Sequence, residues 1–161
     1  MDGFMDTCDA IFSHRDKLTK LKILSDTHAG SFAVMGCVII LIAKTLLFSE
    51  LESQQNIFFI PVNSRLGMAI LLNNLPFAKS DGLAVTLGAL RRKNDNFYLL
   101  AIILILAVLN FQALIIMIAC LIFWSAVCVK LFGGITGDLL GAFVELSEIF
   151  MLAGTVMKNC I

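Results

Sequence analysis

The sequence has few charged residues, no closely spaced cysteine pair and an acidic rather than apolar start, and each of these features argues against a class of protein. Only 15% of its 161 residues are charged and the formal net charge is zero, which excludes nucleic-acid binding through bulk positive charge. Its five cysteines form no Cys-x-x-Cys pair, which argues against a zinc site or a disulfide framework. The first residues are acidic rather than apolar, so we expect membrane insertion to depend on internal helices rather than on a signal peptide.

Apolar residues are abundant and lie in long runs. They make up 59% of the chain, and the mean hydropathy is +0.92. Such runs are typical of transmembrane helices, so we predict an all-α, polytopic membrane bundle forming one domain over 1–161. About five spans are expected: 31–48, 57–75, two short helices within 97–129 that are separated near 110–112, and 139–157. The polar segment 1–28 would precede this membrane region, which covers 31–157.

The polar segment itself has helical character. We predict one helix from Asp2 to about Lys22, followed by a turn over 25–30 in which Asp26 or Thr27 caps the next helix. Lys44 lies near the end of the first span, and we expect its ammonium group to snorkel toward the membrane surface.

The distribution of basic residues predicts which loops share a side of the membrane. Nine of the twelve Lys and Arg residues lie in the stretch 15–22, in the loop 76–96 and at Lys130, whereas the turns near 50 and 110 contain none. Under the positive-inside rule, 1–28, 76–96 and 130–138 face the cytoplasm from the cell (plasma or inner) membrane. An alternating path of five spans predicts the same arrangement.

Three carboxylates near the start of the chain suggest a metal site. Asp2, Asp6 and Asp9 would lie within an arc of about 60° on one face of a helix. Carboxylates at that spacing repel one another unless a cation lies between them, and Mg²⁺ prefers such oxygen ligands. Asp26 could add a ligand from the following turn. The alternative is a solvated acidic face without a metal.

A glycine-rich turn precedes the last span and suggests a phosphate site. In Gly133-Gly134-Ile135-Thr136-Gly137-Asp138, small residues and free N–H groups at a helix start could hold an anion. The alternative is an ordinary turn in which Thr136 or Asp138 caps the helix.

Charged residues inside the predicted spans are further candidates. Arg65 could bind phosphate or neutralise an acid, while Glu145 and Glu148 could bind metal or pair with Arg65. Lys79 in the basic loop could bind phosphate or only help to set the topology.

Four motifs follow one another along the chain: Asp2-Gly3-Phe4-Met5-Asp6-Thr7-Cys8-Asp9, 25–32, Ser64-Arg65 with 75–83, and 133–138 followed by Gly141-Ala142 and Glu145-Leu146-x-Glu148. Together, in this order, they resemble the cobalamin synthase family, the adenosylcobinamide-GDP ribazoletransferases. The resemblance implies a Mg²⁺-dependent transferase that joins adenosylcobinamide-GDP to α-ribazole or its 5′-phosphate and releases GMP. It also implies a bilayer as the protein's environment.

The resemblance assigns roles to the candidate residues. The implied metal ligands are Asp2, Asp6, Asp9, Asp26 and Asp138. The implied catalytic residues are Asp6, Asp9 and Arg65. The implied phosphate-binding residues are Lys79, Gly134, Thr136 and Gly137, with Glu145 and Glu148 in a supporting layer. Any of the aspartates could be the general base.

The sequence departs from the family pattern in several places. Ala10 stands where the family usually has Gly, and Ser25 stands where Lys is common. The family normally has further membrane sequence before the acidic motif, so this chain is expected to correspond to the family without its N-terminal portion.

Two other functions stay open from the sequence. A CDP-alcohol phosphotransferase also uses clustered aspartates, with a Gly after an aspartate pair and an Ala-Arg soon afterwards. In this sequence Ala10 stands in place of that Gly and the nearest Arg is Arg15, so the match is poor. In a small transporter, Arg65, Glu145 and Glu148 could line an ion path. In an inactive membrane remnant, they would have no such role. Formation of a homo-oligomer is also left open.

Overall fold

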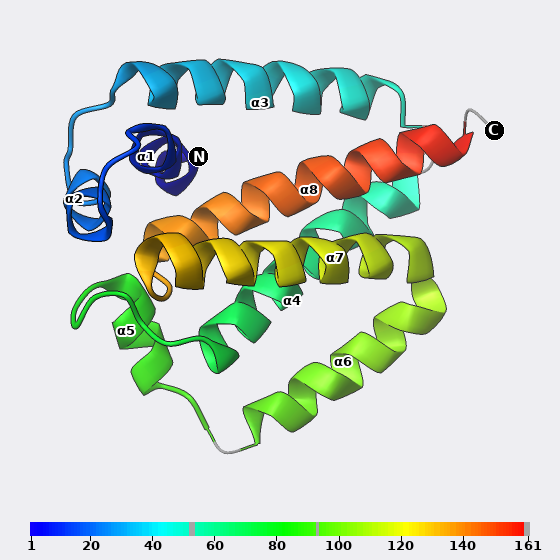
Figure 1. Cartoon of the computed structure of the whole chain (residues 1–161). Helices are drawn as coiled ribbons and strands as arrows, with labels where there is room; N and C mark the ends of the chain where they lie inside the picture. Colours follow the sequence, from blue (N-terminus) through cyan, green and yellow to red (C-terminus); the bar gives the residue numbers. More distant parts are fainter. Residues whose placement is uncertain (52–53, 93, 160–161) are drawn as a thin grey trace.

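The computed structural model describes residues 1–51, 54–92 and 94–159, and helices dominate this part of the chain (Figure 1). The helices are α1 (Asp2–Phe12), α2 (Lys17–Ile23), α3 (Ser31–Ser49), α4 (Gln54–Asn74), α5 (Leu83–Ala89), α6 (Asp95–Leu109), α7 (Phe111–Val127), the π-helical turn η1 (Cys128–Phe132) and α8 (Gly137–Asn159). The predicted all-α helical bundle is therefore confirmed.

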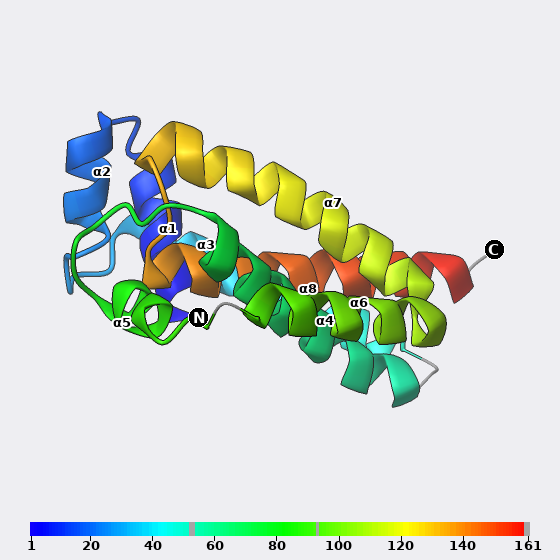
Figure 2. The same cartoon turned by 90° about the horizontal axis from the view of Figure 1, so that it is seen from below.

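Helix α8 lies at the centre of the bundle. Helices α1, α3, α4 and α7 all pack against it, and both views show it running through the middle of the molecule (Figures 1 and 2). Its inward positions are filled by large apolar side chains such as Phe143, Met151 and Leu152, none of which is more than 1% exposed. Helices α1, α2 and α5 gather where α8 begins, and we call this end of the bundle the α1 end.

Three helical stretches are long and apolar enough to cross a membrane: Ser31–Ser49, Phe111–Phe132 and Gly137–Lys158. Helix α3 exposes most of its apolar side chains, including Val38, Ile39 and Ile42, as expected for a helix in contact with lipid. Helix α6 is apolar but has only 15 residues. Helix α4 is long enough but carries several polar residues, including Arg65. The count of five spans therefore stays a prediction.

The predicted interruption of the long apolar run is confirmed. Helix α6 ends at Leu109 and α7 begins at Phe111, so Asn110 alone separates them. The side-chain oxygen of Asn110 accepts a hydrogen bond from the N–H of Ala113 at 3.3 Å, which caps α7. An Asn at this position stops one helix and starts the next.

The prediction of one helix from Asp2 to Lys22 is wrong, because the segment divides into α1 and α2. His14 adopts a left-handed backbone with φ of 51°, which a continuous helix does not allow. Asp16 then caps α2 by accepting hydrogen bonds from the N–H and the hydroxyl of Thr19. The break lets α1 pack against α3 and α8 while α2 packs against η1.

Candidate active site

The acidic residues of α1 lie beside the first turn of α8 because the two helices cross almost in backbone contact. A Cβ atom added at Gly3 would lie 2.6 Å from the Cα atom of Asp138 and 2.7 Å from its carbonyl oxygen. Only glycine allows an approach this close. Gly3 therefore brings Asp2 and Asp6 next to Asp138, although these residues lie more than a hundred positions apart in the sequence.

Four predicted metal ligands line one cavity of about 330 Å³ at the α1 end, which we call the acidic cavity. Its carboxylates come from three segments of the chain: α1, the 25–30 turn and the start of α8. The lining residues with polar side chains are Asp2, Asp6, Ser25, Asp26, Thr27 and Asp138. The spacing of the first aspartates predicted a shared helix face, and the fold adds the two distant carboxylates to it.

Negative charge accumulates in the acidic cavity. Burial raises the pKa of Asp6 to about 6, and the surrounding carboxylates add to this rise. Asp26 differs, because hydrogen bonds from the side chain and the N–H of His28 lower its pKa. Asp26 is thus an anion beside Asp6, a carboxyl group whose ionisation its neighbours oppose. A cation in the cavity would relieve this repulsion.

The donor set of the acidic cavity fits Mg²⁺ in its chemistry. All of its polar side chains offer oxygen, the ligand type that hard divalent cations take. Across the described residues, no three His, Cys, Asp or Glu side chains converge closely enough to enclose an ion by themselves. Mg²⁺ usually keeps several waters and takes only one or two carboxylates together with substrate phosphates, so an open arrangement of this kind suits it.

Asp9 occupies a different position from the other acids. Its two carboxylate oxygens accept hydrogen bonds from the N–H of Gly30 at 2.7 Å and the N–H of Ala33 at 2.9 Å. Asp9 therefore caps α3 from another helix, and it does not line the acidic cavity. The predicted cap by Asp26 or Thr27 is wrong, because the N-cap residue is Gly30 and α1 supplies the carboxylate.

The glycine turn joins the basic loop to the site. The N–H of Ile135 donates to the carbonyl of Pro76 at 2.8 Å, and the N–H of Ala78 donates to the carbonyl of Ile135 at 2.9 Å. A Cβ atom at Gly134 would lie 2.4 Å from the Pro76 oxygen, and the φ of Gly134 is 158°. Gly134 thus permits this pairing, which places the residues after Ala78 beside the start of α8.

A second cavity of about 340 Å³ adjoins the acidic one, and Asp138 lines both. Lys79, Thr136 and Gly137 also line this second cavity, and the Lys79 ammonium group donates to the Ser25 hydroxyl at 2.6 Å. The Thr136 hydroxyl accepts from the N–H of Leu139 at 3.3 Å, so the capping alternative describes the local structure. The Lys79 ammonium group therefore lies beside the carboxylates of the acidic cavity.

Arg65, Glu145 and Glu148 form a separate cluster with Lys44. Arg65 donates to Glu148, which also accepts from the Ser64 hydroxyl at 3.0 Å. The Lys44 ammonium group lies 2.5 Å from Glu145 and 2.7 Å from Glu148. None of these residues lines either cavity. Of the two alternatives, the structure contains the pairing of Arg65 with Glu148, which ties α4 to α8, while the Lys44 pairs tie α3 to α8.

The sequence interpretation missed Lys44 and Gly3. Lys44 does not snorkel, because its side chain is only 16% exposed and pairs with two acids on α8. A lysine in an otherwise apolar helix was the available signal, since a cation within a span needs a partner. Gly3 carried no signal of its own, because its role depends on a helix crossing with α8.

Comparison with known proteins identifies the family. A family model described as Cobalamin-5-phosphate synthase matches residues 1–156. No solved structure matches the chain. Curated relatives named adenosylcobinamide-GDP ribazoletransferase include those of Geobacillus sp. (strain WCH70), 36% identical over 89% of this chain, and of Acinetobacter baumannii (strain ACICU), 32% identical over 94% of it. A third, from Alkaliphilus oremlandii, is 29% identical over all of this chain.

The chain spans 61% of the length of the Geobacillus relative, 65% of the Acinetobacter relative and 68% of the Alkaliphilus relative. The family match covers the acidic residues of α1, the basic loop and the glycine turn before α8. With nearly all of its length matched by one family, the chain belongs to the cobalamin-5-phosphate synthase family.

Proposed function

We propose that this chain carries the catalytic face of a Mg²⁺-dependent transferase that joins adenosylcobinamide-GDP to α-ribazole, or to its 5′-phosphate, and releases GMP. The observation that carries the proposal is the acidic cavity, where carboxylates from three segments meet and adjoin the cavity lined by Lys79. The relatives that support it are named for this ribazole transfer.

In this proposal, the acidic cavity holds the metal: one or two of the carboxylates of Asp2, Asp6, Asp26 and Asp138 bind it directly, and the others balance its charge. A bound Mg²⁺ would neutralise the pyrophosphate and so favour its cleavage. Lys79 would bind a phosphate oxygen from the second cavity, together with the N–H groups at the first turn of α8 near Thr136 and Gly137.

Three further predicted residues act by positioning others. Asp9 holds the 25–30 turn against α1 through its bonds to the start of α3, and so holds Asp26 in place. Gly134 allows the basic loop to reach α8. Arg65 holds α4 against α8 through Glu148.

The proposed reaction is one phosphoryl substitution. A ribazole hydroxyl oxygen forms a bond to the cobinamide-side phosphorus, and the bond from that phosphorus to the bridging oxygen breaks. The bridging oxygen leaves with GMP, and the hydroxyl proton passes to one of the aspartates of the acidic cavity. Placing nucleophile and pyrophosphate together is the main contribution of this chain's residues.

We further propose that the site faces the cytoplasm from the plasma (inner) membrane. The basic residues support this orientation, since most of them lie at or near the α1 end, which also carries the acidic cavity. Among the described residues, no observation favours a transporter, because Arg65, Glu145 and Glu148, which would line an ion path, are held in pairs with one another and with Lys44. Nothing specific favours a CDP-alcohol phosphotransferase either.

Genetic complementation tests the proposed activity. A strain lacking its own adenosylcobinamide-GDP ribazoletransferase would receive this chain, and separately this chain joined to the part of the Geobacillus relative that it does not span. We expect cobalamin-dependent growth with the joined protein. Asp6→Asn should abolish this growth, and Asp16→Asn is the matched control because Asn still caps α2. Growth with the Asp6 variant would contradict the proposal, and so would the failure of both proteins to restore growth.

Metal binding can be measured without turnover. Mn²⁺ titration of the purified protein, followed by electron paramagnetic resonance, should show one site that Mg²⁺ displaces. Asp6→Asn should weaken this binding at least about tenfold, because it removes a charged ligand from the acidic cavity. Asp16→Asn should leave the binding unchanged, and equal weakening by both substitutions would argue against a metal site in that cavity.

A further inference from the structure

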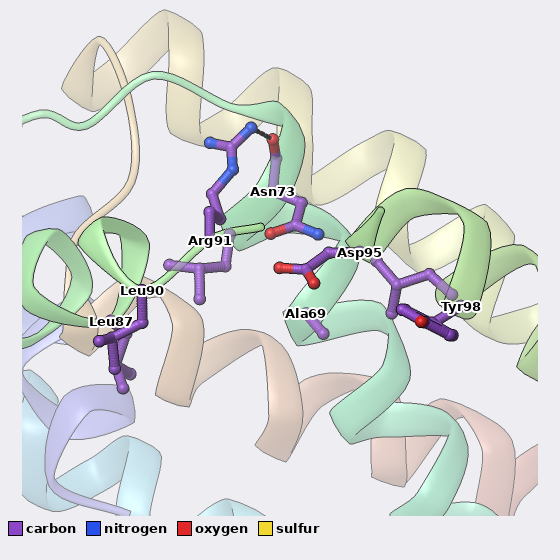
Figure 3. A pocket seen from close by; sticks show the side chains of 9 residues that line it. Ala69, Asn73, Leu87, Leu90, Arg91, Asp95 and Tyr98 are labelled. Carbon is purple, nitrogen blue, oxygen red and sulfur yellow. Dashed lines mark hydrogen bonds between the residues drawn. The ribbon is translucent and has the colours of Figure 1, made fainter. Parts of the chain in front are cut away.

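A third cavity lies between α4, α5 and α6 and shares no residue with the two cavities of the active site (Figure 3). Its volume is about 370 Å³, and we call it the α5–α6 groove. The lining residues are Ala69, Leu72, Asn73, Leu87, Leu90, Arg91, Asp95, Tyr98 and Leu99. No predicted role in the transfer reaction involves any of them.

The groove is amphiphilic. Leucines from α4, α5 and α6 form its apolar wall, and Arg91 and Asp95 contribute one positive and one negative charge. Figure 3 shows both charged side chains close to Asn73, at the end of α4. A ligand matched to this lining has an apolar chain and a head that carries both signs of charge.

Both charged groups are held in place while retaining capacity to bind. Arg91 donates to the Asn73 carbonyl, which uses one of the five N–H donors of its guanidinium group. One oxygen of Asp95 accepts from the N–H of Arg92 at 2.8 Å, and a carboxylate can accept further hydrogen bonds. Neither contact cancels the charge, because both partners are backbone groups.

The surroundings of the groove favour contact with lipid. Leu90 and Tyr98, which line the groove, are 73% and 60% exposed, and Phe97 at the start of α6 is 70% exposed. Exposed apolar patches of this kind beside arginines are typical of the level of lipid headgroups, where aromatic residues also concentrate. These exposed side chains therefore favour a phospholipid over a soluble ligand as the occupant of the groove.

We propose that the α5–α6 groove binds one phospholipid whose headgroup carries a primary ammonium, of the phosphatidylethanolamine type. Arg91 binds the phosphate, Asp95 accepts hydrogen bonds from the ammonium, and an acyl chain lies along Leu72, Leu87 and Leu99. A choline headgroup has no N–H donor for Asp95, and a glycerol headgroup has no cation for it. This lipid site stands independently of the proposed transferase activity.

Native mass spectrometry of the purified protein tests the proposal. The detergent-solubilised chain would be offered phosphatidylethanolamine, phosphatidylcholine and phosphatidylglycerol with identical acyl chains. We expect one retained phosphatidylethanolamine, preferred about tenfold over each of the others, as one charge-assisted hydrogen bond allows. Equal retention of all three lipids, or a preference for phosphatidylglycerol, would overturn the proposal.

Three variants locate the site. Arg91→Gln should weaken retention of all three lipids, because each carries a phosphate. Asp95→Asn keeps an oxygen for the N–H of Arg92 but removes the charge, so it should abolish only the preference for phosphatidylethanolamine. Ala69→Phe should fill the groove and weaken retention without changing any charge. Lys130→Gln, at an exposed position outside the groove, is the control and should change nothing.

Other occupants would give different results. Displacement of the lipid by an equal concentration of soluble glycerophosphoethanolamine would identify a soluble ligand and overturn the lipid proposal. A dimer that retains no lipid would show that a second copy fills the groove, with the same consequence. Circular dichroism and gel filtration establish that each variant is folded, and if Arg91→Gln fails to fold, Asp95→Asn and Ala69→Phe decide the question.

Discussion

The charge cluster within the bundle predicts a large loss of stability when Lys44 alone is removed. Lys44 and Arg65 balance Glu145 and Glu148, so the four side chains carry no net charge. In Lys44→Met, Arg65 would still pair with Glu148, and the Met1 ammonium group, 3.1 Å from Glu145, would be the one cation left beside Glu145. Glu145 would lose the ammonium group now 2.5 Å away, although its side chain is only 16% exposed.

The magnitude follows from this burial. Removing one partner of a buried ion pair costs about 3–5 kcal/mol, since the remaining charge stays desolvated and unpaired. The two remaining cations place the expected cost at the lower end of this range. The Met1 ammonium group lies 3.1 Å from Glu145 but is 33% exposed, and Arg65 is 56% exposed and bonds to Glu148 rather than Glu145. We therefore expect the free energy of unfolding to fall by about 3 kcal/mol. For a chain of this size, that corresponds to a melting temperature lower by about 6–12 °C.

The measurement is thermal unfolding in detergent, followed by circular dichroism, for Lys44→Met, for Glu145→Gln and for the variant that carries both substitutions. Lys44→Met/Glu145→Gln restores the charge balance and should recover at least about half of the loss, which gives a coupling energy of about 1.5 kcal/mol or more. Lys130→Met removes a lysine from an exposed position and should shift the melting temperature by less than about 1 °C. The reasoning is refuted if Lys44→Met has the melting temperature of the wild type. It is also refuted if the loss of stability in the double variant equals the sum of the losses in the two single variants.

Three further predictions concern the site. Gly3→Ala forces α1 away from Asp138 and should cost about 1–3 kcal/mol of stability as well as weaken Mn²⁺ binding; unchanged melting would show that the crossing has room to spare. Asp9→Ala removes the interhelix cap and should cost about 1–2 kcal/mol, whereas Asp9→Asn should cost less, so equal melting temperatures of the two variants would contradict the capping role. Gly134→Ala places a methyl group against the Pro76 carbonyl and should release the basic loop, measured as faster protease cleavage within 76–92; wild-type cleavage would count against it.

Patterns that are local in the chain were predictable. The first span was predicted at 31–48 and α3 covers Ser31–Ser49, because a long apolar run between polar segments has few other ways to satisfy its backbone. Asn110 marked the separation of α6 from α7 because an asparagine caps helices through its own side chain. The shared face of Asp2 and Asp6 follows from helical periodicity alone.

The break between α1 and α2 was missed although its signal is also local. Asp16 and Thr19 form a helix start within a stretch that reads as continuously amphipathic. A continuous helix and two shorter helices bury similar apolar residues at this point. Packing of α1 against α8 and of α2 against η1 favours the broken form.

The sequence by itself determined the class of the protein, most of its helix boundaries and the residues that carry charge, because hydropathy and capping act over a few neighbouring residues. The tertiary structure decided which partner each charge meets. It directed Asp9 to the start of α3, Lys44 to Glu145 and Glu148, and Asp138 to the acids of α1. These partners lie far apart in the chain, so only the crossing of packed helices could select among them.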